Sequence, residues 1–402
     1  MTSYMSILRT PGVARIISAQ LMARFPSGML SLAYLLHIER IHDSYGAAGL
    51  VLAATSIGQA VAGPLTSRWM GRWGMRPVIT LTLVVCLLSM VAIAFIEMPV
   101  WLYMLVGLFG GLSTPPIQPA VRTIYPKMVN SKQLTPLFSL DASAQEIIWV
   151  LGPVITTFIA TQISTTVAIL VAAALLVLGG VWFLSSPEVG RVRIPRSRRA
   201  FGKVLLRRPV LLATIVGFLM IGGTAAVEAS VVAVYGDGGP EAGIVLAIWS
   251  IGSLAGGLSF GHMPVGPWAL ARRMFIVFVG IALAGLVLDF WWLSLTLLIS
   301  GIGLAPALAV CFAIVSASVK FSDTAEAYGW VGTGQLIGAA IGSAIAGFMI
   351  DAYMAVGGFV VASVFVFAGF LFAVIFVRWH PDLRGRDASP IPDTEPVPVQ
   401  PS

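Results

Sequence analysis

Charged residues are scarce in this sequence of 402 residues. Asp, Glu, Lys and Arg together make up 10% of the chain, whereas a soluble domain carries about 25%. The shortage excludes a globular protein with an ordinary polar surface. Hydrophobic residues account for 58% of the chain, and its mean hydropathy is +0.93. The composition therefore indicates a protein whose surface faces lipid.

Cysteine and histidine are also rare, which bears on metal sites and catalysis. Cys86 and Cys311 lie in separate apolar segments without other metal ligands, so we expect both to be small buried side chains. The sequence shows no nucleophile–base group and no phosphate-binding glycine-rich loop outside the apolar segments. We therefore expect neither an enzyme nor a cofactor or metal. The four histidines fall outside the expected membrane core: His37, His42, His262 and His380.

Long apolar runs recur along the whole chain. A helix needs roughly 20 apolar residues to cross a bilayer, and runs such as 166–185 and 358–377 do not alternate as barrel strands would. We predict an all-α polytopic membrane protein with twelve transmembrane helices arranged as two pseudo-symmetric six-helix bundles. The predicted spans are 13–37, 47–67, 77–96, 100–124, 137–160, 165–185, 209–235, 242–261, 268–288, 292–316, 327–350 and 356–377.

One polar interruption divides the chain. We predict an N-terminal bundle over 1–187, a basic linker over 188–208 and a C-terminal bundle over 209–379. The tail, 380–402, is rich in Pro, Asp and Glu and has no apolar period, so we expect it to be disordered.

Lys and Arg are distributed unevenly between the loops. If the N-terminus is cytoplasmic, the inner loops and the inner ends of the spans hold 22 of the 24 basic residues, leaving Arg40 outside and Arg24 deep within a span. Inner loops carry such an excess, so we expect a plasma-membrane protein with both termini in the cytoplasm. The net charge of +7 then follows from topology and does not call for nucleic acid as a partner.

An internal repeat relates the two predicted bundles. Residues 49–58 read GLVLAATSIG and residues 243–252 read GIVLAIWSIG, in the second and eighth spans. Further matches are Gly63 with Gly257, Ala144-Gln145 with Gly334-Gln335, and Gly152 with Gly342. Two parallel six-helix halves with a binding site between them are a known transporter architecture.

With this organisation the chain resembles the major facilitator superfamily over nearly its whole length. That family has a loop of the pattern G-x-L-a-D-R-x-G-R-R between its second and third helices, where residues 67–76 read SRWMGRWGMR. Arg72, Gly74 and Arg76 are in register, but Gly71 stands at the acidic position. In a second register Ser67 stands there. The resemblance implies a gating role for this loop, and the missing acid puts its charge relay in question.

A second match lies in the fifth helix. Drug:proton antiporters of the superfamily have G-x-x-x-G-P-x-x-G-G, and residues 148–157 read IWVLGPVITT. The core of Gly152 and Pro153 is present, and the flanking glycines are absent. The arginine that proton-coupled members carry in helix four would fall near Gly107, so that feature is absent as well. The match favours the antiporter branch, and a packing bend is the alternative reading of Gly152 and Pro153.

Ionisable residues inside spans are the candidates for chemistry, because charge in a bilayer is costly and usually functional. There are five: Arg24, Arg122, Asp141, Glu146 and Glu228. All lie on helices one, four, five or seven, which the resemblance places around the central cavity. A fixed structural ion pair or a buried hydrogen bond is the alternative for each.

Depth suggests how these residues pair. Arg24 lies roughly 16 Å and Glu146 roughly 14 Å from the inner ends of their helices, near the bilayer centre. We predict that they pair directly or through substrate or water, with Glu146 as the proton carrier. Arg122 and Asp141 lie near the inner ends and are expected to form a second pair, whereas Glu228 is a second acidic candidate.

Other polar and aromatic residues are candidates for substrate contact or for packing. Pro26 is expected to bend helix one at the depth of Arg24. Trp101, Trp291 and Trp292 are expected at the membrane interface. The candidate substrate contacts are Gln20, Gln59, Gln118, Gln145, Trp149, Tyr235, Trp249, Trp330 and Gln335.

The function favoured by these features is secondary active transport of a small organic solute by alternating access, as proton-coupled efflux by a monomer. An uptake symporter or uniporter for a sugar-like solute uses the same fold and remains an alternative. An embedded enzyme, a receptor and a scaffold are further alternatives, although the chain has no catalytic constellation or sizeable soluble domain to support them.

Overall fold

The computed structural model describes residues 4–197, 200–235, 241–261, 263–385 and 388–393. Within these ranges the regular structure is helical, apart from an isolated bridge between Lys320 and Ile391. Side chains of helix-capping residues fix where several helices begin. Ser164 accepts a hydrogen bond from Val167 N (3.0 Å), and Asp289 accepts one from Trp291 N (3.0 Å).

The N-terminal half contains six crossings. The helices of this half are α1 (Tyr4–Leu8), α2 (Val13–Arg24), η1 (Phe25–Gly28), α3 (Leu30–His42), α4 (Tyr45–Trp73), α5 (Met75–Phe95), α6 (Val100–Leu112), α7 (Ile117–Ile124), η2 (Tyr125–Lys127), α8 (Ser131–Gln162), α9 (Thr165–Ser185) and α10 (Pro187–Arg191). The first crossing consists of α2, η1 and α3, and the fourth consists of α6 and α7.

The C-terminal half also contains six crossings. Its helices are α11 (Arg208–Tyr235), α12 (Glu241–Phe260), α13 (Ala269–Ala284), α14 (Phe290–Ser318), η3 (Phe321–Asp323), α15 (Thr324–Ile375) and η4 (Val377–Trp379). Helix α15 makes two crossings, because Tyr353 and Met354 have non-helical backbone angles and reverse the chain between them.

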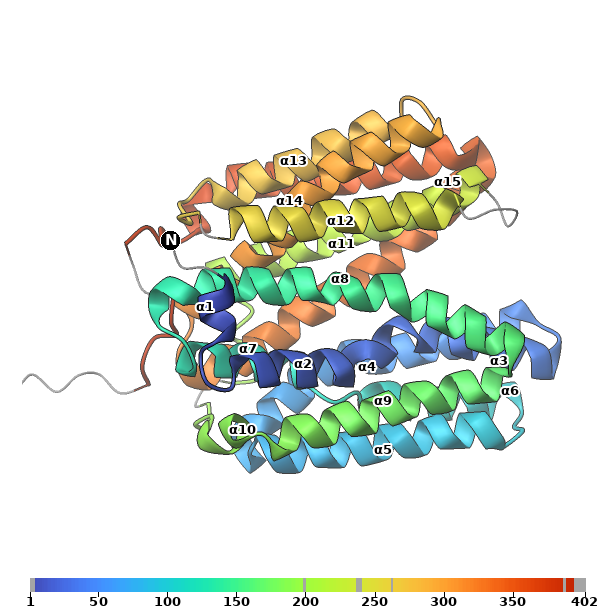
Figure 1. Ribbon diagram of the computed structural model, residues 1–402, viewed down its shortest axis with the longest axis horizontal. Helices are drawn as coiled ribbons and strands as arrows, with labels where there is room; N and C mark the ends of the chain where they lie inside the picture. Colours follow the sequence, from blue (N-terminus) through green and yellow to red (C-terminus); the bar gives the residue numbers. More distant parts are fainter. Residues whose placement is uncertain (1–3, 198–199, 236–240, 262, 386–387, 394–402) are drawn as a thin grey trace, which may run out of the picture.

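The predicted count of twelve is confirmed. Nine helical segments of the described chain are long and apolar enough to span a membrane, with α6, α7 and η2 counted together as one segment. The broken first crossing and the 16-residue α13 add two more, and α15 counts twice. Figure 1 places α5 and α9, the third and sixth crossings, at one edge of the molecule and α13, the ninth crossing, at the other.

Proline breaks two crossings that the sequence presented as continuous. Pro26 lies in η1, a 3-10 turn that separates α2 from α3 directly after Arg24. The fourth crossing was predicted as one helix over 100–124. It stops at Leu112 and restarts at Ile117, because Pro115 and Pro116 cannot donate the backbone hydrogen bonds that a helix interior requires.

The internal repeat corresponds to repeated packing. A Cβ on Gly58 of α4 would collide with the backbone of Leu108 in α6, and a Cβ on Gly252 of α12 would collide with the backbone of Leu298 in α14. Gly58 and Gly252 are equivalent in the repeat. Glycine is therefore needed at both positions for close approach of the second and fourth helices of each half.

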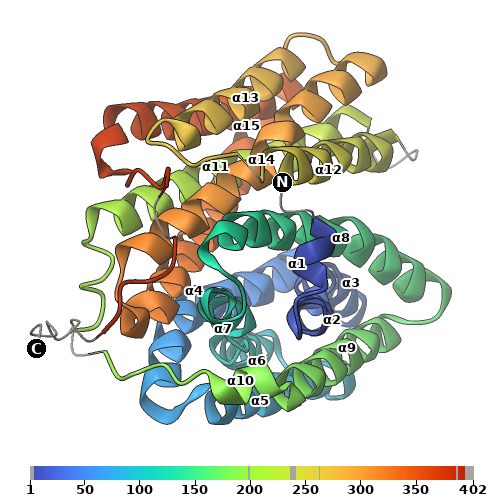
Figure 2. The same ribbon diagram turned by 60° about the vertical axis from the view of Figure 1, so that its left-hand side comes forward.

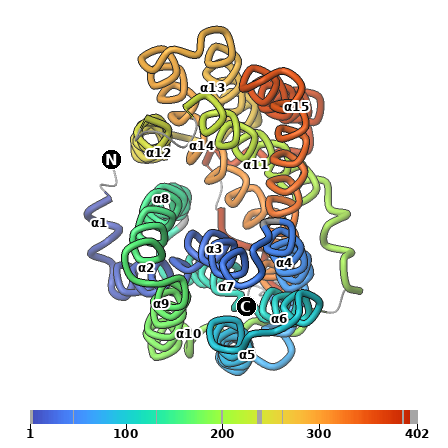
Figure 3. The backbone as a smooth tube through the Cα atoms, turned by 90° about the vertical axis from the view of Figure 1, so that its right-hand side faces the viewer, coloured from blue at the N-terminus to red at the C-terminus, as the bar shows by residue number. Residues whose placement is uncertain are grey.

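Both described ends of the chain lie at one end of the bundle, with α10 and the linker after it (Figure 1). We call this the basic end, and the other the opposite end. Figure 2 turns the basic end forward, and the chain crosses there from α10 to α11. Figure 3 looks onto the opposite end and shows α8 beside α12 and α4 beside α15, the pairs that join the halves.

The described part of the tail is ordered, unlike the prediction for 380–402. Ile391 N donates to Val319 O (2.9 Å), Phe321 N donates to Ile391 O (3.0 Å), and Leu383 N donates to Val265 O (3.0 Å). These backbone hydrogen bonds were missed because they leave no periodic pattern in the sequence. Residues 394–402 lie outside the described residues.

Candidate functional site

Asp141 is the centre of a buried polar network inside the N-terminal half. Its Oδ1 accepts hydrogen bonds from Gln20 Nε2 (2.8 Å) and Tyr125 OH (3.1 Å). Its Oδ2 accepts from Arg122 Nε (3.4 Å) and Gln145 Nε2 (3.4 Å). The predicted pair of Arg122 and Asp141 is therefore present, and both side chains are 1% exposed. Two such buried charges are stable only because each is paired and hydrogen-bonded.

Arg24 belongs to the same network and forms no direct ion pair with Glu146, so the direct form of the predicted pair is wrong, and the form bridged by substrate or water stays a prediction. Its Nη1 donates to Gln20 Oε1 (2.8 Å) and its Nη2 donates to Gln145 Oε1 (2.6 Å). Gln145 and Glu146 are neighbours on α8 and point about 100° apart. Gln145 faces α2 and accepts the hydrogen bond from Arg24, whereas Glu146 faces the C-terminal half.

The network carries an excess of positive charge. Arg24 and Arg122 surround one carboxylate, that of Asp141. The side-chain amide of Gln118 is oriented so that its oxygen faces the two arginines. This oxygen accepts hydrogen bonds from Arg122 Nη2 (2.7 Å) and Arg24 Nη2 (3.2 Å). The Arg122 guanidinium also lies 3.3 Å from the ring centre of Phe312 on α14, so the network reaches the other half.

Glu146 makes its contact across the boundary between the halves. Ser253 Oγ of α12 donates a hydrogen bond to Glu146 Oε1 (2.8 Å). Ser250, one turn away on α12, also interacts with this carboxylate, and the carboxylate of Glu228 on α11 lies within electrostatic reach. Neither Glu146 nor Glu228 forms an ion pair within the described residues. Glu146 is half-buried and Glu228 is exposed.

The halves are joined at the basic end by two related contacts. On one side Ser139 Oγ of α8 donates to Gly257 O of α12 (2.6 Å). On the other, Thr333 Oγ1 of α15 donates to Ala60 O of α4 (2.6 Å), where Gly63 packs against the first turns of α15. Gly63 and Gly257 are repeat equivalents. Each of these glycines packs against the fifth helix of the other half, although the two hydrogen bonds join positions that the repeat does not relate.

The remaining contacts between the halves fall in the same region. Among the described residues, every hydrogen bond that joins membrane helices of the two halves lies between the basic end and the level of Glu146. Beyond that level the helices of the two halves diverge toward the opposite end (Figure 1). The structure is closed at the basic end.

An acidic residue of the other half lies beside the last turns of α4. Arg68 Nη1 lies 2.8 Å from Glu326 Oε2 of α15. Glu326 Oε1 accepts from Gly202 N of the linker (2.8 Å) and from Trp330 Nε1 (3.5 Å). The ring of Phe201 lies close to both Arg68 and Trp330. Its centre is 5.7 Å from the Arg68 guanidinium and 5.7 Å from the centre of the Trp330 ring. Sequence reasoning missed Arg68 and Glu326 as a pair, since only the fold brings them together.

The three residues of the predicted gating loop lie at the basic end, and their gating role stays a prediction. Gly74 ends α4 with a φ of 94°, a conformation that favours glycine. Arg72 is exposed and its guanidinium lies 5.9 Å from the ring of Trp73. Arg76 is exposed beside Gly190 of α10. None of the three is in the Arg68–Glu326 contact.

Some candidate substrate residues lie elsewhere. Trp249 is 5% exposed and packs against α14, so it belongs to the core. Trp330 belongs to the linker contact at the basic end. Tyr235 packs on Phe290 near the opposite end, with ring centres 6.4 Å apart. Gln335 is half-buried and packs beside Gly217 of α11.

The N-terminal candidates lie nearer the charged groups. Gln20, Gln118 and Gln145 belong to the Asp141 network. Trp149 is 56% exposed and points between the directions of Gln145 and Glu146 on α8, because it follows them by four and three residues. Gln59 is half-buried on α4.

Gly152 and Pro153 lie where α8 crosses the broken first crossing. A Cβ on Gly152 would lie 2.7 Å from the carbonyl carbon of Gly28 in η1. Glycine at 152 is therefore needed for this close approach. Helix α8 continues through Pro153 to Gln162.

Comparison with known proteins agrees with this fold. A sequence model of the Major Facilitator Superfamily matches residues 16–288 and 231–401. No curated protein sequence matches the chain.

Three solved structures share the fold. The human organic anion transporter MFSD10 (TETRAN) has a TM-score of 0.69 at 17% identity, covering 90% of this chain and 100% of that one. A bacterial homologue of the iron transporter ferroportin, in an outward-facing state, has a TM-score of 0.71 at 12% identity, covering 91% and 98%. The proton:xylose symporter XylE, bound to 6-bromo-6-deoxy-D-glucose, has a TM-score of 0.67 at 14% identity, covering 94% and 97%.

At these identities the three likenesses establish the fold and leave the substrate open. The family match covers most of the sequence, and the fold, the internal repeat and the contacts between two six-helix halves agree with it. The chain belongs to the major facilitator superfamily and is a multi-pass membrane transporter, not an enzyme.

Proposed function

We propose that this protein is a proton-coupled secondary transporter in which Glu146 carries the proton. The single observation that supports the proposal is the contact of Glu146 with Ser253 across the boundary between the halves. A carboxylate in a membrane interior is costly and marks a pathway or relay by default. Unlike Asp141, it has no arginine beside it among the described residues.

The contact of Glu146 changes if the halves rock. Helices α8 and α12 are held together at the basic end, where Ser139 bonds to Gly257. Opening that end separates α8 from α12, breaks the bond from Ser253 and exposes the carboxylate to water at the basic end. With the basic end closed, Glu146 is reached from the opposite end. One residue therefore meets water from alternate sides, as a coupled carrier requires.

Glu228 is proposed as the second proton site. Its carboxylate and that of Glu146 repel one another when both are ionised. A proton on either group removes the repulsion. Glu228 lies on α11 and Glu146 on α8, so the repulsion acts between the two halves and couples protonation to their separation.

Arg24 is proposed to bind a polar group of the substrate, while Asp141 and Arg122 form a fixed frame around it. Arg24 is half-buried, whereas Asp141 and Arg122 are 1% exposed or less. A frame of this kind holds the guanidinium in one orientation through Gln20 and Gln145. The substrate class that suits it is a small organic solute with an acidic or hydrogen-bond-accepting group.

We further propose that the basic end faces the cytoplasm at the plasma membrane, and that transport is efflux by proton antiport. The inside-positive distribution of Lys and Arg supports the orientation. The Gly152-Pro153 element supports the antiporter branch. Proton-coupled uptake uses the same groups and is the competing direction.

A ligand screen followed by transport assays tests the proposal. Candidate solutes are ranked by the rise in melting temperature of the purified protein, and hits are tested for counterflow in proteoliposomes with and without a pH gradient. If transport is efflux by proton antiport, a lower pH on the side of the opposite end should drive substrate from the side of the basic end to the side of the opposite end. Transport that is the same with and without the pH gradient for every substrate contradicts proton coupling. Accumulation of substrate on the side of the basic end identifies uptake.

A further inference from the structure

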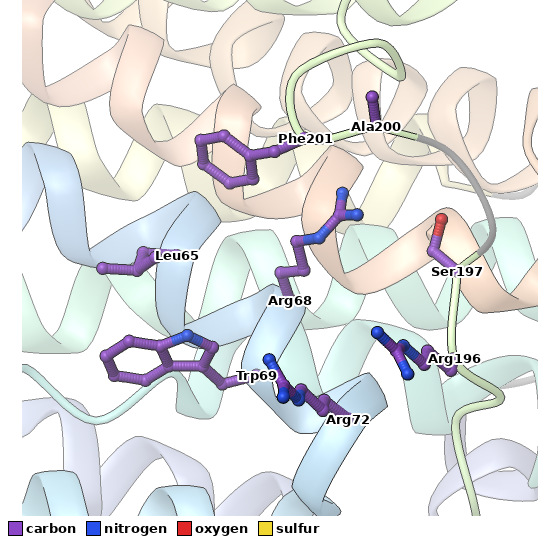
Figure 4. A pocket seen from close by; sticks show the side chains of 8 residues that line it. All are labelled: Leu65, Arg68, Trp69, Arg72, Arg196, Ser197, Ala200 and Phe201. Carbon is purple, nitrogen blue, oxygen red and sulfur yellow. The ribbon is translucent and has the colours of Figure 1, made fainter.

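A cavity of about 1040 Å³ lies at the basic end, apart from the proposed transport site. It is formed between the last turns of α4 and the linker (Figure 4). Its lining residues are Leu65, Arg68, Trp69, Arg72, Arg196, Ser197, Ala200 and Phe201. The volume is at the upper end of the range for small-molecule sites.

The cavity is strongly basic. Three guanidinium groups line it, from Arg68, Arg72 and Arg196, and none of its lining residues is acidic. Figure 4 shows Arg68 and Arg72 on α4 and Arg196 entering from the linker. Glu326 balances the charge of Arg68. Arg72 and Arg196 are exposed and form no ion pair within the described residues, so the cavity retains two positive charges.

The same cavity has an apolar side. Leu65, Trp69 and Phe201 line it beside the arginines, and Trp69 packs on Trp73 with ring centres 5.2 Å apart. Tryptophan is enriched where the hydrocarbon core meets the headgroups. A ligand that fits both sides is anionic at one end and apolar at the other.

The position of the cavity along α4 agrees with such a ligand. This helix has 29 residues, which is about 43 Å at 1.5 Å per residue. The hydrocarbon core is about 30 Å thick. Because α4 is longer than the core, we place its last turns, where Arg68 and Arg72 are one turn apart, in the headgroup layer.

We propose that this cavity binds the phosphate of an anionic phospholipid such as phosphatidylglycerol, with its acyl chains along Leu65 and Trp69. Arginine forks match phosphate oxygens and hold them bidentately. Basic pockets of this kind bind lipid headgroups in other membrane proteins.

Lipid binding is expected to stabilise closure of the basic end. The cavity exists only while the linker lies against α4. Arg68 and Phe201 belong both to the cavity and to the contact with Glu326 and Trp330. A phosphate between Arg72 and Arg196 removes their mutual repulsion and holds the linker in place. The proposal is independent of proton coupling.

The test is lipid retention by the purified full-length protein, measured by native mass spectrometry with phosphatidylglycerol and with phosphatidylcholine. The variant is Arg72→Gln with Arg196→Gln. The matched control is Arg193→Gln with Arg378→Gln, which removes the same charge from exposed positions outside the cavity. We expect phosphatidylglycerol retention to fall about tenfold in the variant and less than about twofold in the control. Phosphatidylcholine retention should be unchanged in both.

Three results overturn the proposal. Unchanged retention in the cavity variant means that the arginines hold no lipid. Equal losses in variant and control mean that diffuse surface charge is responsible. Displacement of phosphatidylglycerol by millimolar inorganic phosphate, without a contribution from the acyl chains, identifies a site for a soluble anion instead.

Discussion

Arg68 of α4 and Glu326 of α15 form an ion pair of 2.8 Å between the two halves, although 258 residues separate them in the sequence. The side chain of Arg68 is 28% exposed and that of Glu326 is 4% exposed. Glu326 also holds the linker through Gly202 N. The pair joins the two halves at the basic end, close to the loop after α4.

Glu326→Gln is expected to favour opening of the basic end. The change removes the charge and keeps an oxygen for Gly202 N, so the ratio of closed to open molecules should fall about fivefold, the effect of about 1 kcal/mol for a partly exposed pair. The measurement is the rate of thiol labelling at Ser143→Cys in a chain without Cys86 and Cys311, because residue 143 is buried beside Gly257.

Asp382→Asn is the control for that experiment. Asp382 pairs with Arg384 at the same end, but both side chains are exposed and the pair joins no helices of the two halves. Labelling at residue 143 should be unaffected. An equal rise in both variants would show that loss of any acid at the basic end is sufficient, and the Arg68–Glu326 pair would lose its special role.

Asp141→Asn is expected to destabilise the N-terminal half. The change leaves the buried Arg122 without a carboxylate, and an uncompensated buried charge costs about 3–5 kcal/mol. The measurement is thermal unfolding in detergent, with Asp351→Asn on an exposed site of α15 as control. Removing Arg122 as well, by Arg122→Gln, should recover part of the loss. A single variant as stable as the parent protein would refute the buried pair.

Gly152→Ala is expected to lower stability despite the better helix propensity of alanine. Alanine gains up to about 1 kcal/mol over glycine in a helix. The added Cβ, however, would lie 2.7 Å from the backbone of Gly28, and overpacking of this kind costs about 1–3 kcal/mol. Thr157→Ala, on an exposed position of the same helix, is the control. A rise in melting temperature for Gly152→Ala would mean that the backbone around Gly28 moves aside at little cost in stability, which contradicts this prediction.

The sequence was sufficient to predict the features that depend on the length of the apolar runs, on composition and on the internal repeat. Apolar runs of spanning length gave twelve crossings, and the match of Gly58 with Gly252 corresponds to equivalent helix contacts. Depth along the helices also brought Arg122 and Asp141 together correctly, because both lie near the same ends of neighbouring segments.

Contacts that depend on helix rotation were not predictable from depth. Arg24 and Glu146 lie at similar depths, but Gln145 faces Arg24 and its neighbour Glu146 faces Ser253. A rotation of about 100° per residue separates them. The pair of Arg68 and Glu326 was missed for a related reason, since no local pattern links the ends of α4 and α15.

The most direct test of the central claim is Glu146→Gln, assayed in proteoliposomes for exchange and for gradient-driven transport, with Glu241→Gln as control. A neutral side chain cannot release a proton, so the variant should exchange labelled for unlabelled substrate and lose accumulation driven by a pH gradient. Glu241→Gln should retain both activities. Gradient-driven accumulation by Glu146→Gln with the pH dependence of the parent protein would contradict the proposal that Glu146 carries the proton.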